Sequence, residues 1–187
     1  LEINKKGILN ASGSFYVNYI FDSIHWRVSA NKWSPINIGE ALYIGTDHML
    51  KSDFSKYVEI FANYSFIWTL ILSEGLTIDD NRRIPYIPMH SFSLGVTANW
   101  NSGNVTLSGH FESERYLTVT NIEELKPFFR LDISFNQTFL KYFTIFVNQT
   151  NCFNSMYEIQ KGYPMPGGAL LLGLKINYET NFIKGEK

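Results

Sequence analysis

The sequence contains little of several features on which folded proteins often rely. Only one of its 187 residues is cysteine, Cys152, which excludes an intramolecular disulfide and a cysteine-rich metal site. Charged residues make up 18% of the chain, below the roughly 25% of an average soluble domain. The formal net charge of -1 gives no reason to expect a nucleic-acid partner.

Long apolar runs are also missing. The longest, such as 66–72 and 169–174, are far shorter than the roughly 18 residues that a membrane helix needs. If the protein enters a membrane, it must therefore cross as β-strands. The chain starts at Leu1, without an initiator methionine or a visible signal peptide, so we expect a piece of a longer protein.

Enzyme motifs are absent from the sequence as well. The four histidines are scattered without metal-ligand spacing, and there is no Gly-x-Ser-x-Gly elbow or phosphate loop. The acidic pairs Asp79-Asp80 and Glu123-Glu124 are interpreted as solvated loop charges. The sequence thus predicts neither an enzyme nor a metal site or cofactor.

Alternation of apolar and polar residues, with a period of two, is what the chain has instead. This period is typical of β-strands whose two faces meet different media, and no segment has a helical pattern. It predicts an all-β fold with about eight antiparallel strands in a meander. Alternation recurs in segments 9–19, 38–48, 58–66, 92–100, 105–111, 129–135, 143–147 and 170–178.

The links between these segments alternate between short and long, which places short turns at one end of the sheet and long loops at the other. Outer-membrane β-barrels have this asymmetry. Large aromatic residues near the strand ends also suit membrane interfaces; they are Tyr19, Trp100, Phe111, Phe129, Phe143 and Tyr178. The short links are 50–55, 101–104 and 137–141, and the long links are 27–36, 69–83, 117–127 and 154–166.

Two motifs near the end of the chain resemble the last barrel strands of TonB-dependent outer-membrane receptors. They are Asn151-Cys152-Phe153 and Tyr163-Pro164-Met165-Pro166-Gly167, and the closing strand 169–178 after them ends in the aromatic Tyr178. Segments 84–90 and 33–47 resemble earlier strands of that family. Departures from the family pattern are Cys152, Gly168, Asp47 and a polar tail over 179–187.

The resemblance implies a curved, partial transmembrane β-barrel over 1–178, the C-terminal part of a receptor, followed by the tail 179–187. It implies energised uptake of a scarce nutrient, such as a siderophore, a corrinoid or a metal chelate, in the outer membrane of a Gram-negative type of bacterium. The implied partners are outer-membrane lipid, a plug domain and the rest of the barrel. A TonB-type energy-coupling protein would act through the missing N-terminal part.

Five charged or titratable residues fall on the polar faces of adjacent predicted strands: His110, Glu112, Glu114, Arg130 and Asp132. They are candidates for a substrate path or for contact with the plug. The alternative, which we favour, is a network of paired charges that holds the wall of the lumen together.

Two other proteins would show the same alternation. One is a complete, closed eight-stranded barrel with a structural or adhesive role; the other is a soluble β-sandwich that binds carbohydrate. Small residues on the polar faces would fill a narrow barrel poorly, but they suit a wide lumen. We therefore predict an open, curved sheet whose first strand (7–20) and last strand (169–178) are unpaired edges.

Overall fold

The computed structural model describes residues 2–5, 9–29, 32–37, 39–72 and 82–176. These residues form strands, turns and loops, with no α-helix among them. Helices able to cross a bilayer are accordingly absent from the described part of the chain.

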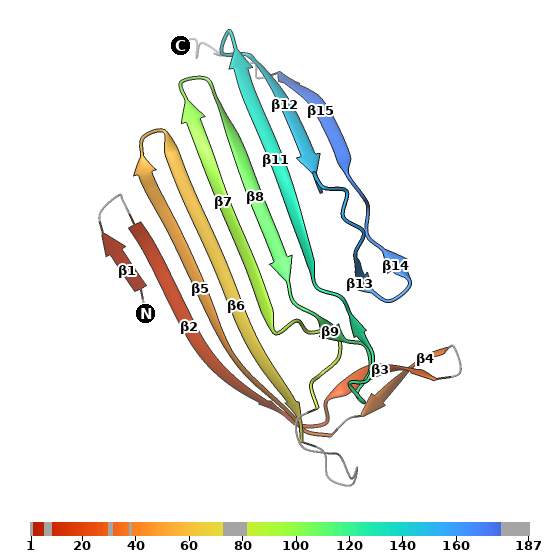
Figure 1. Cartoon of the computed structure of the whole chain (residues 1–187). Coiled ribbons are helices and arrows are strands. Elements are labelled where there is room, and N and C mark those ends of the chain that lie inside the picture. Colours follow the sequence, from red (N-terminus) through yellow and green to blue (C-terminus); the bar gives the residue numbers. More distant parts are fainter. Residues whose placement is uncertain (1, 6–8, 30–31, 38, 73–81, 177–187) are drawn as a thin grey trace, which may run out of the picture.

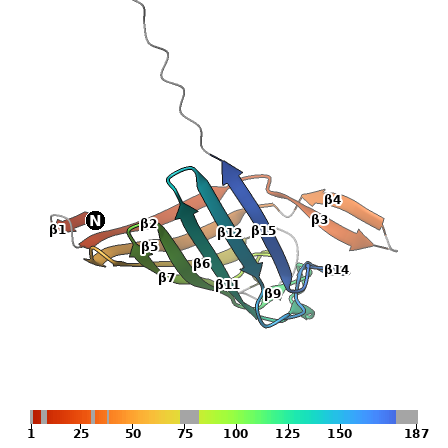
Figure 2. The same cartoon turned by 90° about the horizontal axis from the view of Figure 1, so that it is seen from above.

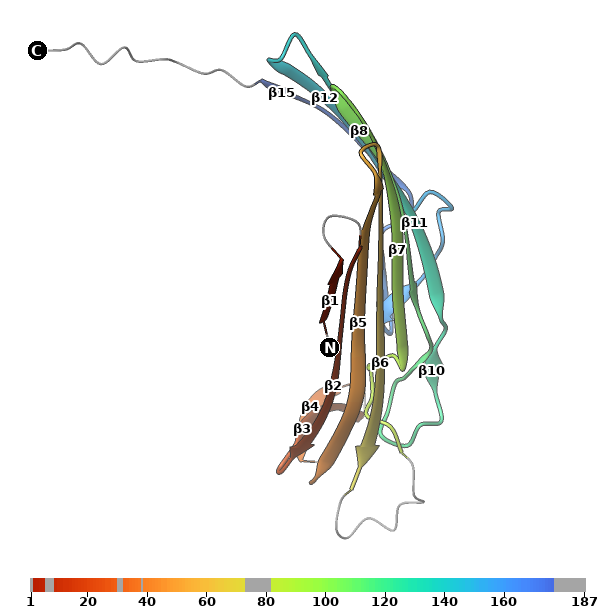
Figure 3. The ribbon, with the colours of Figure 1, turned by 90° about the vertical axis from the view of Figure 1, so that its left-hand side faces the viewer.

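One antiparallel sheet dominates the molecule, and it curves along its length (Figures 1 and 3). Nine strands follow each other in the order of the chain, apart from three small hairpins that leave the sheet. The strands are β1 (Glu2–Lys5), β2 (Leu9–Ile20), β5 (Ala41–Ser55), β6 (Val58–Ile71), β7 (His90–Trp100), β8 (Gly103–Glu112), β11 (Phe128–Phe139), β12 (Phe143–Thr150) and β15 (Ala169–Ile176). The prediction of an all-β meander is confirmed, with β1 as a ninth, short strand.

The three small hairpins lie within or directly beside segments for which the sequence predicts long loops. The ribbon of β3 and β4 projects away from the sheet at the end opposite the short turns (Figures 1 and 2). Hairpin partners are close in sequence, so their mutual hydrogen bonds satisfy backbone groups that an irregular loop would leave to water. The hairpins pair β3 (Ile24–Ser29) with β4 (Lys32–Asn37), β9 (Arg115–Tyr116) with β10 (Glu124–Leu125), and β13 (Glu158–Gln160) with β14 (Tyr163–Pro164).

Two predicted short links are mostly strand. β5 continues to Ser55, and only Lys56 and Tyr57 form the turn to β6. β11 likewise continues to Phe139. The predicted links 50–55 and 137–141 are therefore wrong at these ends. The last residues of β5 and β11 are mostly polar, which hides the period of two. The hydrogen-bonded ladder continues there because it does not depend on side-chain polarity.

The sheet is open. Among the described residues, β1 pairs with β2 alone and β15 pairs with β12 alone. The small closed barrel is therefore wrong, and the open sheet is confirmed. One detail of the prediction is corrected: β2 is not the edge, because β1 covers its residues Leu9–Ser12.

The cross-strand register keeps the two faces of the sheet chemically distinct. One row on the apolar face joins His48, Tyr64, Phe92, Phe111 and Phe129 through consecutive pairs. Side chains on this face are widely exposed, for example Phe15 of β2 at 68% and Leu172 of β15 at 64%. So continuous an apolar surface requires a cover, such as lipid or another protein layer.

Aromatic residues mark two levels on the apolar face of β7. Phe92 lies eight positions from Trp100, which is roughly 27 Å along the strand and, at a tilt of about 40°, roughly 20 Å along a membrane normal. That height is close to the roughly 25 Å apolar band of an outer-membrane barrel.

A small core lies at the end of the sheet away from the short turns. Ala41, Ile71 and Ile84 are buried together. The loop that carries Ile84 is held to the wall because its amide donates to Thr69 Oγ1 at 3.0 Å, while the Ile71 amide donates to the Arg82 carbonyl at 3.1 Å. This loop therefore folds over the polar face.

Candidate functional site: the charged belt and the loop layer

Four of the five predicted site residues meet on the polar face of β8 and β11. His110 pairs directly with Arg130 in the sheet. His110 Nε2 lies 3.1 Å from Glu112 Oε1, and Arg130 Nε donates to Asp132 Oδ2 at 3.0 Å. We call His110, Glu112, Arg130 and Asp132 the charged belt. Each member has a partner within the belt.

Glu114 lies apart from the charged belt. It sits in the link between β8 and β9, beyond the paired strands. Its negative charge acts on the guanidinium of Arg83 in the neighbouring loop. Sequence alternation places Glu114 on the same face as Glu112, but alternation no longer applies once the strand has ended.

Arg115 belongs to this network although the sequence analysis does not single it out. Its side chain is buried, with 2% exposed, and its Nη1 lies 3.2 Å from Glu112 Oε2. Nη2 donates to the Glu158 carbonyl at 3.2 Å, and the guanidinium carbon lies 5.5 Å from the centre of the Phe128 ring. Loop packing rather than strand periodicity sets this position, so no sequence pattern marks it.

Tyr157 connects the hairpin of β13 and β14 to the wall. Its ring stacks on Phe128 with centres 4.1 Å apart and planes 16° apart, and its side chain hydrogen-bonds that of Arg130. Phe128 occupies the polar face at the start of β11 and is buried by this contact. The hairpin is therefore held over the charged belt rather than away from it.

Arg83 connects a second loop to this region. We call the loop segments at this end of the sheet, 82–89, 113–127 and 151–168, the loop layer. Asn121 Oδ1 accepts the Arg83 amide at 2.5 Å, and Asn121 Nδ2 donates to the Arg83 carbonyl at 2.8 Å. The guanidinium carbon lies 5.8 Å from the Trp68 ring centre and 5.7 Å from that of Tyr116. Burial lowers the pKa of Arg83, partly offset by Tyr116 and Glu114.

Asn151 joins the two motifs that resemble the receptor family. It is 2% exposed and has a left-handed backbone with φ of 49°. Its Oδ1 accepts the Ser155 amide at 2.9 Å, and its Nδ2 donates to the carbonyls of Ser155 at 2.9 Å and Pro166 at 3.3 Å. Its own amide donates to Asp132 Oδ1 at 2.8 Å, which connects the motif to the charged belt.

Gly167 lies where a neighbouring side chain approaches the backbone closely. A Cβ at this position would lie 2.3 Å from Asn154 Oδ1, which also accepts the Gly168 amide at 2.8 Å. Close approach of a side chain, not a special φ, therefore explains the glycine.

The other motif residues take separate places. Phe153 is 65% exposed, with its ring centre 6.4 Å from that of Phe129 on the apolar face. Tyr163 and Pro164 form β14, and the Met165 amide donates to the Tyr157 carbonyl at 2.9 Å. Tyr178 and the tail 179–187 lie outside the described residues.

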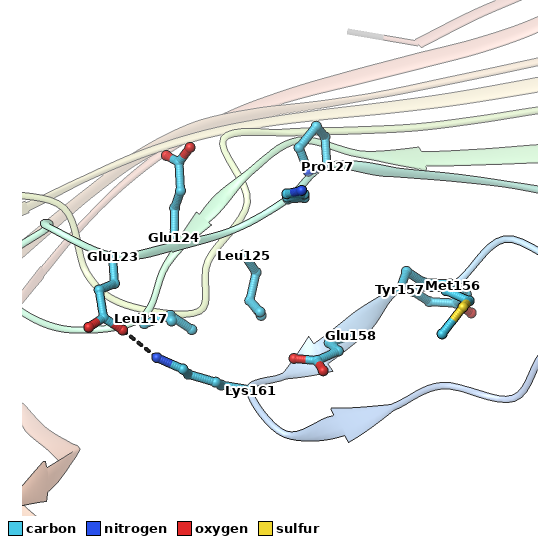
Figure 4. Close-up of a pocket in the computed structure, with 10 residues that line it drawn as sticks. Leu117, Glu123, Glu124, Leu125, Pro127, Met156, Tyr157, Glu158 and Lys161 are labelled. Atoms are coloured by element: carbon cyan, nitrogen blue, oxygen red, sulfur yellow. Dashed lines mark hydrogen bonds and ion pairs between the residues drawn. The ribbon is translucent and has the colours of Figure 1, made fainter.

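A hollow of about 530 Å³ separates the segment that carries β10 from the hairpin of β13 and β14 (Figure 4). Leu117 and Leu125 line one side, and Met156 lines the other, 92% exposed. Lys161 and Glu123 form an ion pair across the gap. The hydrogen bond between the Lys161 and Glu123 side chains raises the pKa of Lys161. The hollow thus has an apolar base and a charged rim.

Metal coordination is not indicated in this layer. Among the described residues, no three histidine, cysteine, aspartate or glutamate side chains are grouped closely enough to hold an ion.

Comparison with known proteins identifies one family. The family model described as TonB dependent receptor-like, beta-barrel, matches residues 2–152. No curated protein matches the chain.

Solved structures share the fold at low sequence identity. The siderophore receptor PiuA from Acinetobacter baumannii aligns with a TM-score of 0.72 and 16% identity over 91% of this chain and 26% of its own. For the copper transporter OprC the TM-score is 0.76, with 16% identity over 95% of this chain and 30% of its own. The ferric yersiniabactin uptake receptor FyuA from Yersinia pestis aligns with a TM-score of 0.70 and 14% identity over 95% of this chain and 29% of its own. The chain therefore spans between a quarter and a third of the length of these proteins.

Proposed function

Because this chain belongs to the TonB-dependent receptor β-barrel family, we propose that it forms the C-terminal wall of a receptor for energised nutrient uptake. The family is one of outer-membrane receptors, not of enzymes. The observation that carries the proposal is the open sheet with one polar and one apolar face. Such a sheet suits a segment of a wide barrel, with lipid on one side and a lumen on the other.

The orientation follows from the two ends of the sheet. The short turns mark the periplasmic end, and the small hairpins mark the cell surface. In this arrangement residues 1–178 are wall and 179–187 are a polar tail. The wall would bind outer-membrane lipid, the remaining barrel strands and a plug domain, and a TonB-type protein would supply energy through the N-terminal part of the receptor.

The charged belt and the hollow have different roles in this proposal. His110, Glu112, Arg130 and Asp132 hold one another and, through Asp132, the Asn151 loop. They position the loop layer and face the plug, with Glu114 at their margin. The hollow offers apolar side chains beside carboxylates and lysines, which suits a ligand with a flat organic body and polar substituents, such as a siderophore, a corrinoid or another metal chelate.

Uptake in cells tests the proposal. The gene for the full-length receptor is deleted, and cells receive ⁵⁵Fe as catecholate, hydroxamate and citrate chelates, labelled cobalamin and ⁶⁴Cu in parallel. We expect the deletion to abolish high-affinity uptake of one of these compounds, and an uncoupler of the proton-motive force to abolish the same uptake in wild-type cells.

Restoration by the plasmid-borne receptor is the control. The proposal would be contradicted if the deletion left the uptake of every compound unchanged, or if the affected uptake persisted after uncoupling.

A further inference from the structure

Three polar aromatic side chains interrupt the apolar face of the sheet. They are His48 of β5, Tyr64 of β6 and His90 of β7, and we call them the interface triad. His48 pairs directly with Tyr64 in the sheet, and His90 pairs with Phe66, the next residue of β6 on this face. The triad therefore joins three neighbouring strands on the face that the proposed orientation turns to lipid.

Ring stacking and one hydrogen bond hold the interface triad together. The ring centres of His48 and Tyr64 lie 6.3 Å apart with planes 16° apart, and those of Tyr64 and His90 lie 6.1 Å apart with planes 21° apart. Tyr64 Oη lies 2.9 Å from His90 Nδ1. The Phe66 ring centre lies 5.3 Å from that of His90. These contacts fix the three polar side chains relative to one another.

The hydrogen bond between Tyr64 and His90 leaves one donor of the pair for a partner outside the protein. With the hydroxyl as donor, the neutral imidazole carries its proton on Nε2; with Nδ1–H as donor, the hydroxyl hydrogen is left over. The exposed His48 ring has no hydrogen-bond partner among the described residues. Donors on a face covered by lipid are costly unless the lipid itself supplies an acceptor.

The interface triad lies at the edge of the apolar band. Tyr64 pairs with Phe92, the upper of the two aromatic levels on β7, and His90 lies two positions beyond Phe92. Those two positions add roughly 5 Å along the membrane normal at a tilt of about 40°, which places His90 roughly 25 Å above Trp100, the height of the apolar band. At this height the triad meets lipid headgroups rather than acyl chains.

Charged side chains are absent from the surroundings of the interface triad on this face. By register, the described residues of β5, β6 and β7 place no Asp, Glu, Lys or Arg there, and the adjoining parts of β2 and β8 present Ala11, Gly13, Phe15 and Phe111. The imidazoles thus have no carboxylate beside them, and an anion bound to them meets no like charge.

We propose that the interface triad binds a phosphate group of a phosphorylated glycolipid, the lipid class that forms the outer leaflet of a Gram-negative outer membrane. The proposal rests on the receptor function and the orientation proposed above. An ionised phosphate is a strong hydrogen-bond acceptor, so its bonds from the imidazole N–H groups and the Tyr64 hydroxyl are charge-assisted. One bound headgroup would satisfy donors from three strands.

Lipid binding to the purified full-length receptor tests the site. Native mass spectrometry in a non-ionic detergent measures the affinity for three probes: diphosphoryl lipid A, its dephosphorylated form and phosphatidylglycerol. We expect the wild-type receptor to bind diphosphoryl lipid A about tenfold or more tightly than either other probe, which is the size of effect that one charge-assisted hydrogen bond supplies.

Two variants and a matched control assign the binding to the interface triad. His48→Phe combined with His90→Phe keeps aromatic rings but removes the imidazole donors, and it should weaken binding of diphosphoryl lipid A about tenfold. His90→Gln keeps an N–H donor and should retain most of the affinity. Gln149→Leu is the control, because Gln149 lies on the same face opposite Ile133 but its amide donates to the Thr150 carbonyl at 3.3 Å. Its loss should leave the affinity unchanged.

Equal affinity for the phosphorylated and dephosphorylated forms of lipid A would overturn the phosphate site. An equal loss in Gln149→Leu and in the double histidine variant would overturn the role of the triad. Phosphatidylglycerol binding as tightly as diphosphoryl lipid A would overturn the assignment to a glycolipid.

The two proposals fail separately, because lipid binding requires no uptake. Normal, energy-dependent uptake without a preference for the phosphorylated lipid overturns the lipid site and leaves the receptor function standing. A clear preference in a receptor whose deletion alters no uptake supports the lipid site and overturns the transport function.

Discussion

Aromatic rings on the polar face lie over glycines of the neighbouring strand. The Phe61 ring covers Gly95, its direct cross-strand partner. The same arrangement joins Tyr16 to Gly45 and Phe146 to Gly173. A ring that lies over a glycine covers the backbone where the strand has no side chain of its own to pack. It therefore compensates for the stability that the glycine costs the strand.

Gly95→Ala should destabilise the wall. A Cβ at this position would lie 2.1 Å from Phe61 Cε1, so the ring must lift, at a cost of about 1–3 kcal/mol for an overpacked site. Urea unfolding in lipid vesicles measures the loss. Combining it with Phe61→Leu should recover part of the stability, and losses that simply add would contradict the contact.

Asn151→Ala should release the loop that carries Tyr157. The change leaves the Ser155 amide and two carbonyls without their partner and keeps a non-glycine residue in a left-handed conformation. We expect a loss of about 2–3 kcal/mol and faster protease cleavage within 154–161.

Asn151→Gly is the matched variant, because glycine accepts the left-handed backbone but still lacks the amide. It should lie between wild type and alanine. Equal stability of all three proteins would show that the side chain does not hold the loop.

A titration should detect the Lys161–Glu123 ion pair as a raised pKa of Lys161. Its hydrogen bond raises the pKa of Lys161 above the ordinary 10.5, so the stabilisation is present below that pH and lost as pH rises through the raised value. Both groups are exposed, and the effect on global stability should be small. NMR of ¹³C-methylated lysines should find Lys161 titrating late, and Glu123→Gln should return it to its ordinary range.

Among the elements, the turn between β11 and β12 is unusual in composition. Leu140 and Lys141 both have a left-handed backbone, with φ of 50° and 65°, and the Tyr142 amide donates to the Phe139 carbonyl at 3.1 Å. This hairpin turn normally favours Asn-Gly. The sequence therefore does not reveal the turn type, although it places a turn in this region.

Leu140→Asn combined with Lys141→Gly should stabilise the protein by about 1 kcal/mol, because both residues suit a positive φ. The free energy of unfolding in vesicles measures the gain. Lys56→Gly in the turn between β5 and β6 is the control, since Lys56 has no positive φ; a similar gain there would point to a cause other than turn conformation.

For the molecule as a whole, the decisive feature is that the two outer strands, β1 and β15, each have one edge that pairs with no other described strand. β15 presents a free backbone edge and four leucine or isoleucine side chains that are each about 60% exposed: Leu170 at 60%, Leu172 at 64%, Leu174 at 58% and Ile176 at 63%. Open edges are costly in lipid and prone to pairing in water.

The isolated chain should therefore partition into detergent or lipid and not remain in buffer, because its apolar face has no cover of its own. Sedimentation after extraction with and without detergent measures this. A monodisperse monomer that unfolds cooperatively in plain buffer would contradict the membrane interpretation.

The sequence alone determined the β-strands, their antiparallel order and the division into two faces. A period of two is a local property: each residue of a strand points opposite to its neighbour whatever the rest of the chain does. The same pattern placed His110, Glu112, Arg130 and Asp132 together, since they lie on consecutive strands of the meander, which a long link joins.

Only the tertiary structure decided where the strands end, that β1 covers β2, and which residues complete the charged belt. Arg115, Tyr157 and Asn151 act through contacts between segments distant in sequence, and no local period encodes such contacts. The same holds for the open edges, because closure depends on curvature summed over all the strands rather than on any single one.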